Sequence, residues 1–277
     1  MKKYLGISLA VIIMLSACKG NKTDNTKTQA QNPTTKALIN RFAPIIQGVW
    51  VKVDYLDKII RSKSPVASQD LAWGITTLII DTQLIDGDSL LAGASFNNHE
   101  GGNVVIKFKP GKSISSICAG KGDLSFNIAN GDTTLIYIEQ NADTHKNIVS
   151  KYRRALIKPR SADDDAAYGL DYLVNKALFA GNYVYNNSAG QQAIVTFTND
   201  FRVKGLEGFK TFLPLIDMST GPMNNLDNII FDETGDNSKT FIFKIDADTL
   251  KLYNMYANAD SSKQVLGPLK YKLVKKK

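Results

Sequence analysis

The sequence repeats itself, and this repeat constrains the fold more than any other feature of the chain. Matching residues recur in the same order at a constant interval of 117 positions: Phe126 and Phe243, Ile128 and Ile245, Leu135 and Leu252, and the Asn-Ala-Asp triplets at 141–143 and 258–260. Tyr152-Arg153 corresponds to Tyr271-Lys272 after two extra residues in the second copy. A chain of 277 residues is long enough for two domains of ordinary size. The repeat therefore predicts two domains with the same fold.

The beginning of each copy also repeats. Leu38-Ile39-Asn40-Arg41 is followed by Gly48-Val49-Trp50, and Leu173-Val174-Asn175-Lys176 is followed by Gly181-Asn182-Tyr183. Each stretch predicts a short helix that leads into a first strand opening on glycine and an aromatic residue. Ser161–Asp165 predicts the start of the second helix, because Ser and Asp side chains cap free backbone amides. We expect domains at 36–158 and 159–277.

The remainder of each copy has the pattern of short strands. Apolar residues alternate in runs that turn-forming groups separate: 49–56, 75–80, 89–96, 104–108, 124–128, 133–138 and 149–157 in the first copy, and 193–197, 201–206, 229–231, 241–245, 250–256 and 269–274 in the second. Asn130-Gly131 predicts a two-residue hairpin, because a type I′ turn needs positive φ at both central positions. Asp246-Ala247-Asp248 stands at the matching place. The pattern favours an antiparallel meander that closes into a barrel or stacks as a sandwich.

The N-terminal residues have the composition of an export signal. Met1-Lys2-Lys3 is basic, the apolar stretch from Leu5 to Leu15 is too short to span a membrane, and small residues follow it. Leu15-Ser16-Ala17-Cys18 resembles the lipobox of bacterial lipoproteins. That resemblance implies removal of the signal peptide 1–17 and attachment of diacylglycerol and a further acyl chain such as palmitate at Cys18. Several acyl chains anchor a protein stably.

The segment after the cysteine predicts a tether. Residues 18–35 are polar and poor in aliphatic and aromatic side chains, which is typical of a flexible linker. Lys19 stands where an acidic residue retains some lipoproteins in the inner membrane, so the resemblance favours the outer membrane. We therefore expect an outer-membrane lipoprotein of the cell envelope, facing the periplasm or the cell surface.

The two β modules resemble a second family. A short helix, then Gly-x-Trp on the first strand of an antiparallel meander, then a basic residue near the last strand, resembles the lipocalin-like barrels. The resembling residues are Gly48, Trp50 and Arg153 in the first copy, and Gly181, Tyr183 and Lys272 in the second. In that family the arginine lies across the tryptophan at the closed end of the barrel, a cation–π contact. The resemblance implies an all-β fold of two tandem antiparallel meander β-barrels, each preceded by a short helix.

An apolar insertion at 207–228 distinguishes the second copy. It contains candidates for contact with a ligand or partner: Phe209, Phe212, Leu213, Ile216 and Met218. A segment this apolar is not expected to lie free in water. The alternative to an interaction surface is that it packs as a plug or lid over its own barrel, or against the first module.

The sequence lacks the usual catalytic and cofactor motifs. With lipid on Cys18, Cys118 has no disulfide partner and is predicted to be a small buried hydrophobe. The two histidines, His99 and His145, have no second ligand at metal spacing, and Asp163-Asp164-Asp165 is interpreted as a helix cap rather than a calcium site. No phosphate loop or nucleophile elbow is present. We expect no metal, no cofactor and no enzymatic activity.

Charge bounds the choice of partners. The formal net charge is +8, and removal of Lys2 and Lys3 with the signal leaves 8 − 2 = +6. Lysines and arginines concentrate at 151–160 and 270–277, which we interpret as solvated surface, with anionic lipid headgroups or glycans as the alternative partner. No nucleic-acid-binding motif is present, and we expect no nucleic-acid partner.

These observations predict a non-catalytic, membrane-anchored envelope lipoprotein. Its lipocalin-like barrels would bind a small apolar or amphipathic ligand or a partner surface, because a barrel of about eight strands can hold one small ligand. The alternative is a structural or protein-interaction subunit of the cell envelope, with filled barrels and no ligand. A hydrolase would need paired carboxylates, or a nucleophile and a base, facing one cleft. Cavities inside the barrels distinguish a carrier from an interaction module.

Overall fold

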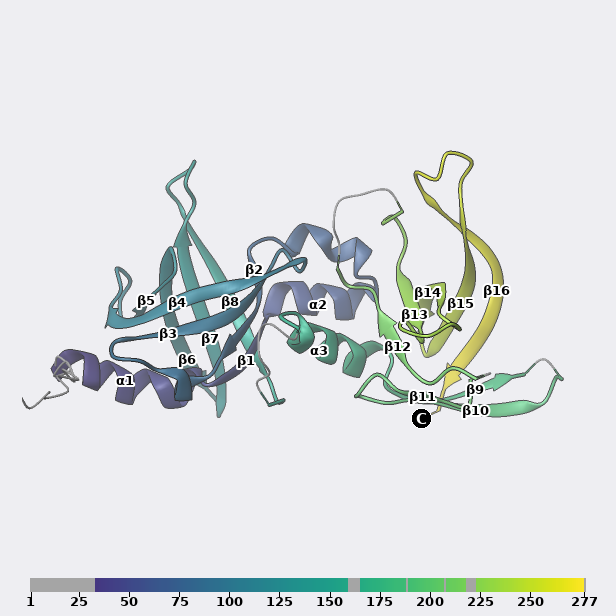
Figure 1. The fold of residues 1–277 in the computed structure, drawn as a ribbon, viewed down its shortest axis with the longest axis horizontal. Helices are drawn as coiled ribbons and strands as arrows, with labels where there is room; N and C mark the ends of the chain where they lie inside the picture. The colour runs from purple at the N-terminus through teal and green to yellow at the C-terminus, as the bar shows by residue number, and fades with distance from the viewer. Residues whose placement is uncertain (1–32, 159–164, 188, 207, 218–222, 277) are drawn as a thin grey trace, which may run out of the picture. The chain divides into compact units, whose positions relative to one another are not determined.

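The computed structural model describes residues 33–158, 165–187, 189–206, 208–217 and 223–276 (Figure 1). The predicted signal peptide, Cys18 and most of the predicted tether lie outside these residues, as do Asp163, Asp164 and Met218. The described chain begins with α1 (Pro33–Ile46), which leads directly into β1 (Gly48–Lys52). The second copy begins in the same way, with α3 (Tyr168–Leu178) before β9 (Gly181–Asn186). Both predicted helices are therefore present. The predicted start of the second helix at Ser161–Asp165 is wrong where the structure describes it: Asp165 is not helical, and α3 begins at Tyr168 after Ala167, without a side-chain cap.

The first domain is a closed antiparallel barrel. After β1 its strands are β2 (Ile75–Ile80), β3 (Ser89–Phe96), β4 (Glu100–Pro110), β5 (Ile117–Ala119), β6 (Gly122–Ala129), β7 (Asp132–Gln140) and β8 (Asn147–Ala155). Each strand pairs with the next along the chain, and β8 pairs with β1 to close the barrel. The predicted meander barrel is confirmed for this copy.

One predicted strand of the first copy is wrong. The run 49–56 reads as a single strand in the sequence, whereas β1 ends at Lys52 and the helix α2 (Val53–Ser62) follows at once. The apolar spacing changes from two residues to the helical spacing at this point, and the buried residues of α2 are Tyr55, Leu56 and Ile59. The short 3₁₀ helices η1 (Val66–Leu71) and η2 (Thr82–Leu84) flank β2.

The second domain is an eight-stranded sheet. After β9 it contains β10 (Gln192–Phe197), β11 (Val203–Lys204), β12 (Phe212–Pro214), β13 (Asn228–Phe231), β14 (Lys239–Asp246), β15 (Thr249–Ala257) and β16 (Gln264–Lys275). Its order is β11-β10-β9-β16-β15-β14-β13-β12.

The end strands of this sheet, β11 and β12, approach each other without forming a ladder. One isolated bridge joins Arg202 to Thr211, and the Val203 amide donates to the Lys210 carbonyl at 2.8 Å. The prediction of two closed barrels is thus confirmed for the first copy, whereas the second copy is a sheet of matching strand order. The predicted strand 201–206 is shorter than expected, because Gly205 turns the chain with φ +82°.

The repeat seen in the sequence has a counterpart in the strand register. In the first domain Phe126 pairs with Leu135, and Leu135 pairs with Tyr152. In the second, Phe243 pairs with Leu252, and Leu252 pairs with Tyr271. Residues that match in sequence therefore occupy matching positions across three strands of each sheet.

Two buried clusters form the core of the described chain. One fills the first barrel, and its largest members are Phe42, Trp50, Phe108 and Tyr152. The other comprises the inner face of the second sheet together with residues of α2, α3 and the outside of β1. The helices α2 and α3 contact each other within this second cluster. Each sheet thus has its own core, and α2 and α3 join the second core to the wall of the first barrel.

Candidate functional site

The interior of the first barrel is filled by its own side chains. The inward-facing residues of the strands, with Phe42 and Ile46 of α1, form one cluster in which no buried member is more than 7% exposed. Trp50, Phe108 and Tyr152 are fully buried there. A ligand-sized space is therefore not expected inside this barrel, and binding has to be sought on its outer surface or in the second domain.

Trp50 closes one end of the first barrel. Its indole nitrogen donates to the Ile46 carbonyl at 2.7 Å, and the guanidinium carbon of Arg154 lies 4.6 Å from the ring centre. The sequence prediction named Arg153, which is wrong by one residue: Arg154 is the strand neighbour of Trp50, whereas Arg153 contacts Asp57 at 3.3 Å. Successive side chains of a strand point to opposite faces, so only Arg154 shares the face of Tyr152 and Trp50.

Tyr183 has the corresponding place in the second domain. Its hydroxyl donates to the Phe179 carbonyl at 2.7 Å, four residues earlier, as Trp50 does to Ile46. The Lys275 ammonium lies 5.7 Å from the Tyr183 ring centre and is partly desolvated, which lowers its pKa. The predicted partner Lys272 is wrong, since it is exposed and pairs with Lys251 instead.

Gly48 and Gly181 are both required by this closure. Their φ angles are +127° and +144°, a region that residues with a side chain rarely adopt. A Cβ atom on Gly181 would also come within 2.7 Å of Cε of Lys275. The glycine at this position therefore leaves room for the base that covers the aromatic ring.

The apolar insertion of the second copy packs into its own domain. Phe212 lies in β12, Phe212 and Ile216 are buried, and Phe209 packs partly buried against the same core. Leu213 is half-buried. These four residues also line pockets, so their contact with a ligand stays a prediction.

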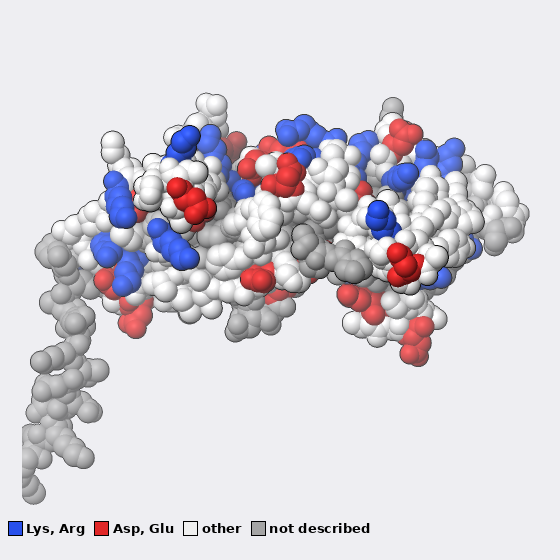
Figure 2. Space-filling view, turned by 90° about the horizontal axis from the view of Figure 1, so that it is seen from above, with Lys and Arg blue, Asp and Glu red and all other residues white. Residues whose placement is uncertain are grey.

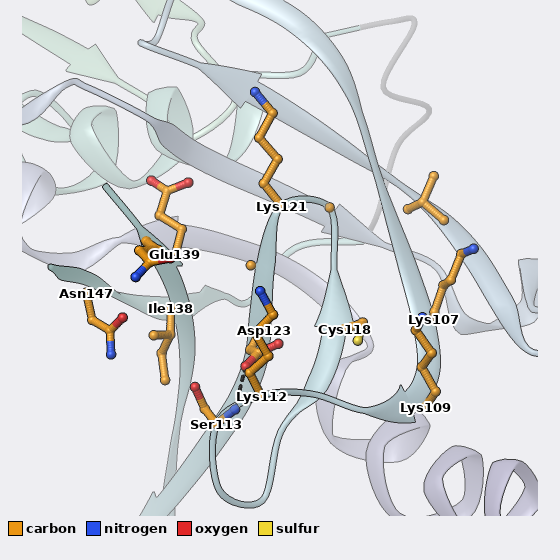
Figure 3. A pocket seen from close by; sticks show the side chains of 14 residues that line it. Lys107, Lys109, Lys112, Ser113, Cys118, Lys121, Asp123, Ile138, Glu139 and Asn147 are labelled. Atoms are coloured by element: carbon orange, nitrogen blue, oxygen red, sulfur yellow. Dashed lines mark hydrogen bonds between the residues drawn. The ribbon is translucent and has the colours of Figure 1, made fainter. Parts of the chain in front are cut away.

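The outer wall of the first barrel carries a basic pocket of about 490 Å³ (Figure 3). Four lysines line it: Lys107 and Lys109 of β4, and Lys112 and Lys121 on either side of β5. Lys107 and Lys109 alternate with the buried Phe108, which places both on the outer face of β4. In the view of Figure 3 these two lysines lie across the pocket from Glu139 and Asn147.

Apolar and polar residues share the rest of the lining of this lysine pocket. Val105, Cys118 and Ile138 contribute apolar surface, together with the glycines at 120 and 122. Cys118 is partly exposed rather than fully buried as predicted, and its thiol donates weakly to the Pro110 carbonyl at 3.5 Å. Asp123 is buried and already accepts a hydrogen bond from the Ser113 amide at 2.6 Å. Four lysines beside Val105 and Ile138 suit a molecule with an anionic group and an apolar portion.

A second pocket, of about 560 Å³, lies on the second sheet. Its lining includes three aromatic residues, Phe209, Phe241 and Tyr271, and two lysines, Lys239 and Lys270. On the face shown in Figure 2, lysines and arginines lie among acidic residues.

Comparison of the chain with known protein families, with curated proteins and with solved structures found no match. Within the described ranges, no helix is long and apolar enough to cross a membrane. The same residues contain no cluster of three or more His, Cys, Asp or Glu side chains arranged to hold a metal ion. The functional argument therefore rests on the geometry of the pockets.

Proposed function

We propose that this protein is a lipid-anchored, non-catalytic binding protein of the cell envelope, built from two lipocalin-like barrels. Its ligand is an anionic amphipathic molecule, bound on the outside of the first barrel. The observation that carries this proposal is the contrast between a barrel interior filled by side chains and an outer wall with a lysine-lined pocket. The bridge between Arg202 and Thr211 supports treating the second sheet as a barrel with one weak seam.

The charges of the pocket favour an anion. Four lysines face two acidic residues, and one of these, Asp123, is buried in a hydrogen bond with the chain. Lysine ammonium groups attract phosphate and carboxylate groups, and each contributes roughly 1 kcal/mol near an anionic surface. Val105 and Ile138 offer apolar contact directly beside these charges. An amphiphile with a phosphate group could contact both the lysines and the apolar side chains of the pocket.

The predicted anchor places this pocket near such molecules. Lipid on Cys18 and a tether of the predicted composition would hold the first barrel within roughly 20–25 Å of a membrane surface. Headgroups of anionic lipids would then be the most abundant ligands within reach. The same chemistry is offered by a free amphiphilic phosphate, and the experiment separates the two sources.

Vesicle flotation tests the proposal. The full chain carrying Cys18→Ser, which removes the anchor, is mixed with phosphatidylcholine vesicles with or without phosphatidylglycerol, and separately with monomeric dodecyl phosphate. We expect binding to an anionic form, and at least a tenfold loss in the double variant Lys107→Glu/Lys121→Glu, because the site charge changes by four. Binding only to dodecyl phosphate would identify a free amphiphile as the ligand.

The control reverses the same number of charges elsewhere. Lys239→Glu/Lys270→Glu alters the pocket of the second sheet and the net charge equally. Equal loss in both double variants would show non-specific attraction and overturn the proposal, as would absence of binding to every anionic form.

The filled first barrel also favours a second function, a structural or protein-interaction subunit. Crosslinking in host cells through a photoreactive residue at Lys109 distinguishes the two. A single protein partner trapped in stoichiometric yield would favour the interaction subunit, whereas labelled lipid would favour the binding protein.

A further inference from the structure

Two adjoining pockets meet at the start of α3. The first, of about 370 Å³, is lined by the turn between β3 and β4, by the chain entering α3 and by the chain that follows β12. The second, of about 290 Å³, shares Asp165, Asp171 and Leu213 with the first. The two pockets therefore adjoin, and the same two aspartates line both; we treat them together as one acidic site.

The lining of this site is strongly acidic. Asp165, Asp171 and Asp217 line the first pocket, and Glu233 joins the two shared aspartates in the second. Among the described residues, no lysine or arginine lines either pocket, and the one basic side chain there is His99. The site is thus opposite in charge to the lysine pocket and calls for a different ligand.

The carboxylates differ in how they are satisfied. Asp217 accepts from His99 Nδ1 at 2.7 Å, and Asp165 accepts from the Ala167 amide at 2.9 Å. In the part of the chain that the structure describes, no base or hydrogen-bond donor is paired with the Asp171 carboxyl. Burial, and the neighbouring Asp165 and Asp217, raise the pKa of Asp171 well above its ordinary value. The centre of the site therefore holds a carboxyl group without a counter-charge.

A buried amide provides an independent sign of a missing partner. Asn98 lines the first pocket and is only 2% exposed; its Nδ2 donates to the Ile216 carbonyl at 2.8 Å, but its Oδ1 has no hydrogen-bond partner among the described residues. The buried hydroxyl of Tyr55, on α2, also lacks a partner within that part of the chain. Burial raises the pKa of Tyr55, and the charges of Asp171 and Asp217 raise it further. A buried acceptor without a partner destabilises the protein, and a bound donor would remove that cost.

We propose that this site binds an elongated organic cation with at least two ammonium groups, such as a diamine or polyamine. An ammonium group has three donors, and here it would pair with Asp171 and Asp217. The second pocket offers Glu233 together with the rings of Tyr168 and Phe201, whose centres lie 6.3 Å apart, and aromatic faces attract ammonium groups. Adjoining pockets with separate acids fit two charges joined by an alkyl chain.

Other ligands fit this site less well. Within the described residues no three acidic or histidine side chains are arranged to hold a metal ion, which favours an organic cation over a metal. Carboxylates beside a histidine could also serve a hydrolase, but such an enzyme would need an accessible nucleophile. In the first pocket the described residues contribute one side-chain hydroxyl, that of Ser95, which is only 2% exposed. The exposed hydroxyls of Thr211 and Thr234 line the second pocket, but none of the described residues that line it is a histidine that could serve as their base. The geometry therefore favours binding over hydrolysis.

Binding of the cation is linked to proton release. Asp171 must ionise before it can pair with an ammonium group, so affinity should rise with pH as the solution passes through its raised pKa. The other titratable groups facing it are Asp165, Asp217, His99 and Tyr55.

Calorimetric titration of the full chain with spermidine and with 1,5-diaminopentane tests the proposal. We expect saturable binding that is at least tenfold weaker in Asp171→Asn and in Asp217→Asn, and unchanged in the control Asp143→Asn, which alters an exposed turn. Butylamine, with one charge, should bind at least tenfold more weakly than the diamine. Failure of the diamines to bind, equal competition by Mg²⁺, or equal losses in the control would overturn the proposal.

A stability measurement shows whether the Asp171 variant is folded and informative. Because the folded pKa of Asp171 is raised, its contribution to stability is complete below the ordinary pKa of aspartate and is lost as pH rises through the folded value. Asp171→Asn should therefore raise the midpoint of thermal unfolding at neutral pH without ligand, and the gain should vanish in acid. A stabilised variant that still bound spermidine at full affinity would contradict the proposed site and leave the lysine pocket untouched.

Discussion

The two domains close one end by the same arrangement of backbone and different side chains. In each, a glycine with positive φ precedes an aromatic residue that donates to the carbonyl four positions earlier, and a base from the last strand covers the ring. The first domain uses Trp50 and Arg154, and the second uses Tyr183 and Lys275. The arrangement therefore requires a glycine with positive φ, an aromatic residue with a hydrogen-bond donor, and a base at the right position in the last strand. Different aromatic and basic residues can fill these positions.

The pairing of the first and last strands differs in register between the two copies. Tyr152 and Arg154 are two positions apart, whereas Tyr271 and Lys275 are four apart, although both bases pair with the aromatic residue of the first strand. A shift of two residues along a strand keeps a side chain on the same face. The pairing of β16 with β9 is thus shifted by two residues relative to that of β8 with β1, and it still places a base over Tyr183.

The largest expected loss of stability comes from substitution of the aromatic residue in each domain. Trp50→Ala removes a fully buried indole and should lower the free energy of unfolding by about 3–5 kcal/mol. Tyr183→Phe removes only the hydroxyl hydrogen bond and should cost about 1–2 kcal/mol, because it leaves the Phe179 carbonyl unpaired. Urea unfolding followed by fluorescence or circular dichroism measures both. A larger loss for Tyr183→Phe would show that the two closures are not equivalent.

The next largest effect is expected in hydrogen exchange where the end strands of each sheet meet. The first barrel closes through a ladder of four residue pairs between β1 and β8, whereas one bridge joins the ends of the second sheet. Amides of Val203 and Phe212 should therefore exchange with deuterium at least tenfold faster than those of Val49–Val51 under native conditions, which corresponds to about 1.4 kcal/mol. Equal protection would mean that the second sheet is as firmly closed as the first.

Much of the fold follows from local patterns in the sequence. Most of the alternating runs, the Asn130-Gly131 hairpin and the helices before Gly48 and Gly181 correspond to elements of the structure, since each depends on near neighbours in the chain. The sequence does not reveal the helix α2, because a valine-rich strand runs into it without a turn residue and the change of period falls inside one apolar run.

The pockets could be predicted only in part. Lys107 and Lys109, two apart on a predicted strand, indicate a pair of lysines on one face, but their meeting with Lys121 depends on how the barrel bends. The acidic site joins His99 to Asp217, which are 118 residues apart and belong to different copies of the repeat. The residue pattern within one copy cannot predict a contact between copies. The sequence therefore predicts only a turn between β3 and β4, and no binding site.

The smallest expected effect compares the matching hairpins. Asn130 and Gly131 adopt φ values of 53° and 83°, which their side chains tolerate, but Ala247 adopts φ 51° at the place of Asn130. Alanine in this conformation costs about 1 kcal/mol, whereas asparagine hydrogen-bonds locally and costs less. Ala247→Asn should therefore stabilise the protein by about 0.5–1 kcal/mol, seen as a rise of about 1–4 °C in Tm.

The reciprocal change identifies the cause of that gain. Asn130→Ala should lower Tm by a similar amount, because it places an alanine at positive φ in the first hairpin, as Ala247 is in the second. The Lys63 ammonium donates to the backbone carbonyl of Ala247 at 2.8 Å, and this contact survives both substitutions. If Asn130→Ala lowered Tm while Ala247→Asn left it unchanged, the difference between the hairpins would come from the surroundings of α2 rather than from backbone conformation.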